Sequence, residues 1–303
     1  MSRATISLPQ SLPQPQQRGF LATTRRDNWW VMPAITLIYF LSFIVYSTWA
    51  ALQGNHYYFE GSAAQIAEDG WRSQYLSPMY SPPLWVDSSR EGSVPIHHAW
   101  LGEWPSWLPK LLLGFIPITP ALLVLWMPGG FRITCYYYRG AYYKAFWGDP
   151  PNCAVGEPRG TYWGEQKGPL VIQNIHRWFM YLAVIFIFIL SYDAIISYIF
   201  VQTDAAGHVT SRKFGVGVGS IVLTLNAFLL AMYTFGCHSL RHVIGGNNDC
   251  VSANAARYKA WKCVTCLNER HMQWAWVSLF WVGFTDIYIR LCSMGIWSDW
   301  RLI

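Results

Sequence analysis

The stretch YTFGCHSLRH at residues 233–242 marks the point where a long apolar segment ends and one thiol and two imidazoles follow. As a helix, the apolar segment before it is long enough to cross the hydrocarbon core of a bilayer. If the helix continues through this stretch, His238 and His242 are four residues apart and lie on one face. Two imidazoles in that arrangement predict a metal site where a membrane helix meets the aqueous boundary.

The chain as a whole has the composition of an integral membrane protein. Of its 303 residues, 53% are hydrophobic and 13% are charged, which is too apolar for an ordinary soluble domain. Eighteen Trp and eighteen Tyr suit the boundary between hydrocarbon and headgroups. The net charge of +6 contains no Lys/Arg-rich run, so we expect no nucleic-acid partner.

Five apolar segments predict an all-α bundle of five transmembrane helices. They are residues 30–52, 107–127, 177–201, 214–235 and 272–294. The second segment contains Pro117 and Pro120, which we expect to kink the helix and not to end it.

The distribution of basic residues predicts the orientation of the bundle. Fifteen of the 22 Lys and Arg lie in the N-terminal tail and in the loops after the second and fourth spans. The positive-inside rule places these on the cytoplasmic side, with the N-terminus inside and the C-terminus outside. We expect residues 1–28 to be a flexible cytoplasmic tail. Residues 29–303 then form the anchor domain, with a large exterior loop at 53–106 that is folded as a cap.

The predicted cytoplasmic ends of the spans collect thiols and imidazoles. Two Cys and two His are the ligands of a Rieske-type [2Fe–2S] cluster. The favoured ligand set is Cys135, Cys153, His238 and His242. The further candidates are Cys237, His176 and His271. The Cys-x-His and Cys-x-x-His spacing of soluble Rieske proteins is absent, so inert thiols and hydrogen-bonded imidazoles remain an alternative.

Other chemistry remains open on the residues alone. A single haem b between two of the histidines is possible. Cys263-x-x-Cys266 is a weak zinc or redox motif, because no second pair accompanies it. Charged residues inside spans are costly, and Asp193, Asp286 and Arg290 indicate either pairing between helices or a proton-handling or transport role.

Several separate motifs resemble the cytochrome-b-like membrane anchor of the actinobacterial type of succinate dehydrogenase. They are FRITCYYYR at 131–139, PPNCAV at 150–155, QNIHR at 173–177, CHSLRH at 237–242 and RHMQWAW at 270–276. The resemblance implies a respiratory complex II with one five-span anchor and a membrane-embedded Rieske-type cluster in place of haem. It implies Cys135, Cys153, His238 and His242 as ligands, with Cys237 competing for a thiolate position.

The resemblance also implies an electron relay in a bacterial cell membrane. Succinate would be oxidised in a soluble flavoprotein subunit, and a soluble iron–sulfur subunit would pass the electrons to this chain and on to quinone. A quinone headgroup needs hydrogen-bond donors at the membrane boundary. The residues expected to bind the quinone are His176, Arg177, Trp178, His271 and Trp274. A fumarate reductase anchor and a non-redox transporter or scaffold are the alternative functions.

Overall fold

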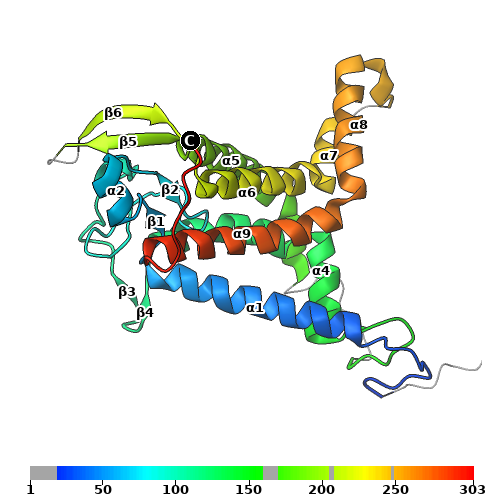
Figure 1. The fold of residues 1–303 in the computed structure, drawn as a ribbon. Helices are drawn as coiled ribbons and strands as arrows, with labels where there is room; N and C mark the ends of the chain where they lie inside the picture. Colours follow the sequence, from blue (N-terminus) through cyan, green and yellow to red (C-terminus); the bar gives the residue numbers. More distant parts are fainter. Residues whose placement is uncertain (1–18, 160–169, 205–207, 247–248) are drawn as a thin grey trace, which may run out of the picture.

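Four long helices run side by side in the computed structural model (Figure 1), which describes residues 19–159, 170–204, 208–246 and 249–303. They are α1 (Val31–Gln53), α5 (His176–Ile196), α6 (Val218–Phe235) and α9 (His271–Ser293). Each is long and apolar enough to cross a membrane. Helix α6 packs against both α5 and α9, whereas α1 fully buries only Ala50 and Ala51. That pattern is expected of a bundle whose outer surface faces lipid.

The second predicted span is not one helix, and five spans in the predicted bounds are not confirmed. Residues 107–119 form turns and a hairpin of β3 (Leu111–Leu112) and β4 (Ile116–Pro117). Helix α3 (Pro120–Ile133) begins at the proline that we expected to lie inside the helix. Proline suits a first helical position, because its missing N–H would have no partner there. At 14 residues, α3 is about 21 Å long.

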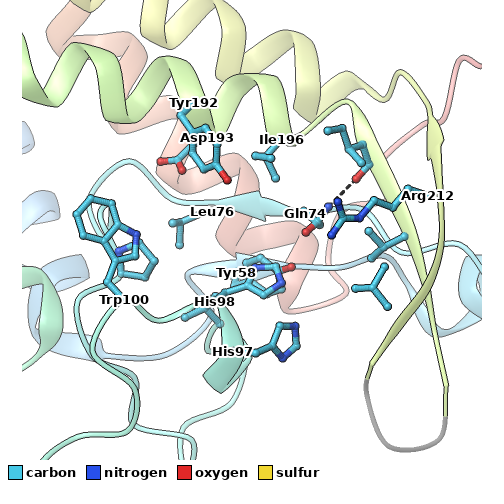
Figure 2. Close-up of a pocket in the computed structure, with 15 residues that line it drawn as sticks. Tyr58, Gln74, Leu76, His97, His98, Trp100, Tyr192, Asp193, Ile196 and Arg212 are labelled. Carbon is cyan, nitrogen blue, oxygen red and sulfur yellow. Dashed lines mark hydrogen bonds between the residues drawn. The ribbon is translucent and has the colours of Figure 1, made fainter.

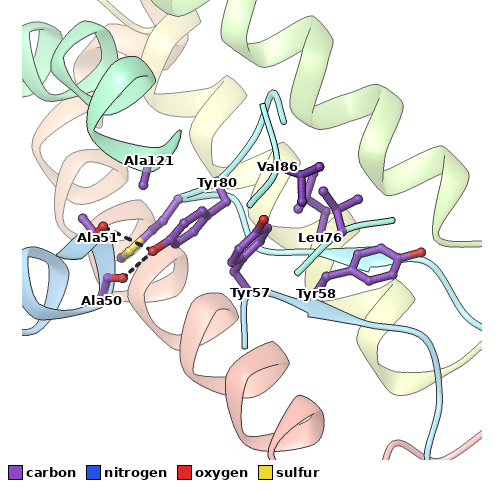
Figure 3. Close-up of a cluster of buried hydrophobic side chains, with 10 residues drawn as sticks. Ala50, Ala51, Tyr57, Tyr58, Leu76, Tyr80, Val86 and Ala121 are labelled. Carbon is purple, nitrogen blue, oxygen red and sulfur yellow. Dashed lines mark hydrogen bonds between the residues drawn. The ribbon is translucent and has the colours of Figure 1, made fainter. Parts of the chain in front are cut away.

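The chain between α1 and α3 folds into a cap over one end of the bundle. It contains α2 (Ala63–Asp69), the 3₁₀ turn η1 (Ile96–His98) and a pair of short strands, β1 (Tyr58–Phe59) and β2 (Tyr75–Leu76). Its core is aromatic (Figure 3): Tyr57 stacks on Tyr80 with ring centroids 4.0 Å apart. The Tyr80 hydroxyl donates to Ala50 O at 2.8 Å, which ties the cap to the end of α1. The predicted loop is therefore a folded unit, while its exterior location stays a prediction.

Buried charges attach the cap and the C-terminal helix to the rest of the bundle. Asp286 and Arg290 form an ion pair within α9, with Oδ2 and Nε 3.3 Å apart, and the Tyr46 hydroxyl donates to the same carboxylate at 2.6 Å. Asp193 accepts a hydrogen bond from Ser81 of the cap. Asp286 and Arg290 thus form an ion pair within one helix, and Asp193 is hydrogen-bonded to a serine of the cap.

The hairpin of β5 (Ile199–Thr203) and β6 (Val209–Phe214) extends from the same end of the bundle. Helix α5 ends at Ile196 and α6 begins at Val218. The hairpin therefore contains the last residues of the third predicted span and the first residue of the fourth. The all-α prediction therefore holds for the bundle but misses the two-stranded sheets, of which the described part of the chain contains three.

The opposite end of the bundle carries shorter helices. They are α4 (Tyr136–Tyr142), the π-helical turn η2 (Tyr143–Trp147), the 3₁₀ turns η3 (Leu170–Ile175) and η4 (Val251–Ala253), α7 (His238–Gly245) and α8 (Ala255–Glu269). Figure 1 shows α8 projecting from the bundle beside α7. Part of the predicted tail lies against this end, where Thr23 Oγ1 donates to Ala154 O at 2.8 Å. Residues 1–18 lie outside the described residues, so a flexible tail stays a prediction.

Candidate metal centre

Two thiols and two imidazoles converge at the end of the bundle opposite the cap. Cys135 Sγ lies 3.8 Å from His271 Nε2, and Cys237 Sγ lies 3.2 Å from His176 Nε2. Cys135 and Cys237 belong to one buried cluster of side chains, which also holds Phe131 and Tyr233, the rings that stack on His176 and His271. Cys135, Cys237 and His271 are buried and His176 is half-buried. The four side chains therefore form one cluster of nitrogen and sulfur donors.

The donor set consists of two thiol–imidazole pairs. Among the described residues, no three Cys, His, Asp or Glu side chains gather as the ligands of a single ion would. A binuclear iron–sulfur cluster with two Cys and two His needs only two protein ligands on each metal. Each imidazole faces a thiol, Cys135 with His271 and Cys237 with His176.

Each cysteine occupies a break between two helices. Cys135 is the N-cap residue of α4 with φ −68° and ψ 132°, and Cys237 is the N-cap residue of α7 with φ −65° and ψ 136°. At an N-cap, the side chain faces backbone N–H groups that lack partners within the helix. Burial raises the pKa of the Cys237 thiol to about 11 and also raises the pKa of Cys135, while these N–H groups oppose the shift. A cation in the cluster would be needed to hold both sulfurs as thiolates at neutral pH.

The two breaks share a sequence pattern. Each has an aromatic residue four positions before the cysteine and an arginine four positions after it. The residues are Phe131, Cys135 and Arg139 in the first break, and Tyr233, Cys237 and Arg241 in the second. With only three matching positions, the pattern is too short to stand out as an internal repeat.

The aromatic residue of each break stacks on a histidine of the cluster. Phe131 lies against His176 with ring centroids 4.8 Å apart and planes 9° apart. Tyr233 lies against His271 with centroids 4.9 Å apart and planes 18° apart. Each histidine is the first residue of the next long helix, α5 or α9. The centre is thus built from two similar halves, and the cysteine of each half faces the histidine of the other.

The favoured ligand set is not brought together by the structure. Cys153 is exposed in a loop, where its carbonyl oxygen accepts from Arg25 at 3.0 Å. His238 and His242 do share a face of α7, with their Nε2 atoms 3.0 Å apart, but both are exposed. Helix α6 ends at Phe235, where the fourth predicted span ends, and Cys237 adopts an extended conformation before α7 begins. That turn directs Cys237 inward, and of the favoured set only Cys135 remains in the cluster.

The residues expected to bind quinone divide between two places. His176 and His271 belong to the cluster of thiols and imidazoles. Arg177 lines a neighbouring cavity of about 390 Å³ between α5 and α7, together with Tyr181, His242, Val243 and Gly246. Trp178 is 70% exposed on the surface of α5. Trp274 packs against the core around the cluster, and its buried Nε1 has no partner among the described residues.

A second cavity lies at the cap end and is separate from the cluster. It has a volume of about 430 Å³, and Figure 2 shows Asp193, Arg212, His97 and His98 around it. None of the predicted ligand or quinone-binding residues lines it. Asp193 is 17 residues after His176 on α5, which places the two about 25 Å apart along the helix.

Comparisons with known proteins agree on one family. The model of the family described as actinobacterial succinate dehydrogenase subunit SdhC matches residues 31–295. A solved structure titled Mycobacterium smegmatis Sdh1 complex in the apo form contains a chain that is 38% identical to this one. The match covers 98% of both chains with a TM-score of 0.74. No curated protein matches the chain. With four apolar helices long enough to span a bilayer, this multi-pass membrane protein belongs to the actinobacterial succinate dehydrogenase subunit SdhC family.

Proposed function

We propose that this chain is the membrane anchor of a succinate:quinone oxidoreductase and holds a Rieske-type [2Fe–2S] cluster through Cys135, Cys237, His176 and His271. The convergence of two buried thiols and two imidazoles carries the proposal. Two thiolates on one iron and two imidazoles on the other define this type of cluster. When bound, it would accept and pass on single electrons.

Positive electrostatic groups surround the proposed ligands. Helices α5 and α9 begin at the two histidines, and α4 and α7 begin after Cys135 and Cys237, so four N-terminal ends with partial positive charge meet here. Arg132 is half-buried beside them, with its guanidinium 4.7 Å from the centre of the Tyr233 ring. It is held by hydrogen bonds to Ala275 O at 3.2 Å and Ser278 Oγ at 3.1 Å. These groups favour the added negative charge of a reduced centre.

The cavity between α5 and α7 is the proposed quinone site. Its volume falls within the range of roughly 300–1,000 Å³ typical of ligand pockets. The Arg177 guanidinium and the His242 imidazole offer hydrogen-bond donors to the two quinone carbonyls. Arg177 follows His176 in the chain, so the cavity adjoins the cluster. Reduction of quinone to quinol takes two electrons and two protons, and the exposed His238–His242 pair connects the cavity to water.

The proposed partners are a soluble flavoprotein subunit that oxidises succinate and a soluble iron–sulfur subunit. Both would dock on the cytoplasmic end, where α8 projects beyond the bundle (Figure 1). Arg257, Lys259 and Lys262 are exposed on this helix and would orient an acidic partner surface. This arrangement puts the N-terminus in the cytoplasm and the cap outside the cell.

Low-temperature EPR of the intact reduced complex tests the cluster. Wild type should show the signal of a His-ligated [2Fe–2S] centre, which differs from that of all-Cys clusters. His176→Ala and His271→Ala should each abolish this signal and electron transfer to quinone. Succinate oxidation with an artificial acceptor at the soluble subunits should persist.

Matched variants identify the ligands. His238→Ala and His242→Ala should keep the EPR signal, although His242→Ala should slow quinone reduction. Cys153→Ser should keep both the signal and the activity. Loss of the signal in His238→Ala with retention in His176→Ala would refute the ligand assignment, and a silent wild-type complex would refute the cluster.

A further inference from the structure

The two halves of the centre differ at the residue just before the cysteine. In the first half this residue is Thr134, whose Oγ1 lies 2.8 Å from His176 Nδ1. The same hydroxyl donates to Gly130 O at 2.7 Å. A hydroxyl has one hydrogen, so its oxygen must accept the second bond, and His176 must donate from Nδ1. A neutral imidazole with its hydrogen on Nδ1 has a bare lone pair on Nε2.

That lone pair is directed at the proposed cluster. His176 Nε2 faces Cys237 Sγ at 3.2 Å, and the Phe131 ring stacked on the imidazole restrains its plane. Thr134 is 2% exposed, so water does not compete strongly for its hydroxyl. The Thr134 hydroxyl, together with the backbone of Phe131, therefore favours the tautomer in which the nitrogen nearest the thiol is ready to bind a metal.

The second half has no such hydroxyl, and there is no room for one. Gly236 takes the position equivalent to Thr134. A Cβ there would lie 2.9 Å from Met232 O, 3.1 Å from Leu267 O and 3.2 Å from His271 Nδ1. Among the described residues, the buried Nδ1 of His271 has no hydrogen-bond partner.

We infer that Thr134 is a positioning residue that sets the tautomer of His176 and makes the two imidazole ligands electronically unequal. The inference rests on the proposed function, in which both histidines bind the cluster. A ligating imidazole becomes more basic when its other N–H donates to an acceptor. A more basic ligand stabilises the oxidised metal, so Thr134 lowers the reduction potential of the centre through His176.

The test uses the intact complex and two readouts that do not depend on turnover. One is the midpoint potential from an EPR-monitored redox titration. The other is the set of remote-nitrogen couplings in pulsed EPR, which report each imidazole separately. Thr134→Val removes the hydroxyl at nearly constant volume, so it should raise the potential and change the couplings of one imidazole only. Thr134→Ser should resemble wild type in both.

Thr234→Val is the matched control. Thr234 is equally buried, at 2% exposed, and lies three residues before Cys237, but no described hydrogen bond joins it to either imidazole. It should change neither readout. A similar potential shift in both valine variants would show a general packing effect and contradict a specific role for Thr134.

Further outcomes separate this inference from the function on which it rests. A wild-type complex without a His-ligated signal would remove the proposed function itself. A Thr134→Val complex with wild-type potential and couplings would overturn the inference and leave the function intact. If Thr134→Val does not assemble a cluster, the cluster content of Thr134→Ala and Thr134→Ser tests the role of the hydroxyl. Loss of the cluster in Thr134→Ala but not in Thr134→Ser would support the role of the hydroxyl. Loss of the cluster in both variants would contradict that role.

Discussion

Gly236 decides where the side chain of Cys237 points, because it lets α6 end directly against the last turn of α8. The backbone of Gly236 has φ −77°, which any residue can adopt, so the requirement is for space and not for a left-handed conformation. Asn268 Nδ2 donates to Gly236 O at 2.8 Å and fixes the same close approach. The cluster geometry therefore depends on a residue that has no ligand atom.

Gly236→Ala should displace α8 and the His271 ring, since its Cβ would lie 3.1 Å from Leu267 O and 3.2 Å from His271 Nδ1. Overpacking of this kind typically costs about 1–3 kcal/mol. We expect a lower thermal unfolding midpoint and reduced cluster content by EPR. Gly140→Ala, in α4, is the control, because a Cβ there meets no atom within 4 Å. Equal cluster content in the two variants would show that the close approach at Gly236 is not required.

The candidate residues could be predicted from the sequence, but their combination could not. Cys237, His176 and His271 are candidates from the sequence alone, since each lies at the predicted end of a span. The favoured ligand set differs from the observed cluster because of His238 and His242. They do lie four residues apart on one face of α7, but that face is exposed and points outward. The deciding fact is a break at Cys237, and a Gly-Cys dipeptide alone does not predict one. The aromatic-x₃-Cys-x₃-Arg pattern occurs at both breaks, but three matching positions are too few to predict them from the sequence.

The contact between helices α3 and α5 depends on a small residue in α3. This helix packs against α5, and a Cβ at Gly130 would overlap the Phe179 ring, whereas a Cβ at Gly129 meets nothing within 4 Å. Phe179 lies three residues after His176, so this contact also positions a proposed ligand. The bounds of α3 differ from the prediction because the apolar run that begins at Trp107 has the composition of a transmembrane helix. In the structure the helix begins only at Pro120.

Gly130→Ala should therefore destabilise the subunit by about 1–3 kcal/mol, the usual cost of overpacking. Gly129→Ala should be neutral or slightly stabilising, because alanine exceeds glycine in helix propensity by up to about 1 kcal/mol. Thermal unfolding of the purified complex measures both. A smaller loss of stability in Gly130→Ala than in Gly129→Ala would contradict the observed packing of α3 on α5.

The cap should loosen in mild acid through His98. Burial, together with the neighbouring His97, lowers the pKa of His98 to about 4, below its ordinary value of 6.5. The unfolded cap then binds a proton more readily than the folded cap, so the stability contributed by neutral His98 is complete above pH 6.5. It falls as the pH drops from 6.5 towards 4.

Limited proteolysis of the cap between pH 7 and pH 4.5 measures this effect. Cleavage should rise as the pH falls in wild type, and the rise should be smaller in His98→Gln. His97→Gln, at an exposed neighbouring position, is the control and should keep most of the pH dependence. An unchanged pH profile in His98→Gln would exclude His98 as the titrating group.

At the scale of the whole molecule, composition and hydropathy were sufficient to predict a membrane bundle. Four predicted spans match α1, α5, α6 and α9, because runs of about 20 apolar residues have few other stable structures. Hydropathy could not predict the hairpin of β5 and β6 or the bounds of α3, since short strands and proline starts leave no strong periodicity. The aromatic core of the cap rests on contacts between distant residues, which no local pattern contains.

The proposed orientation can be tested with a cysteine placed in the cap. Ser88 is exposed on the cap, so Ser88→Cys should react with a membrane-impermeant maleimide in intact cells. Native exposed thiols such as Cys153 lie at the opposite end of the bundle and should stay unlabelled until the membrane is opened. Labelling of Ser88→Cys only in inverted vesicles would reverse the orientation.

Iron and acid-labile sulfide content, measured per purified complex, tests the central claim most directly. Cys237→Ser should lose about two irons and two sulfides relative to wild type, the content of one [2Fe–2S] cluster. Cys153→Ser should retain the wild-type content. Full iron and sulfide in Cys237→Ser, with a loss in Cys153→Ser, would contradict the assignment of the buried thiols to the metal centre.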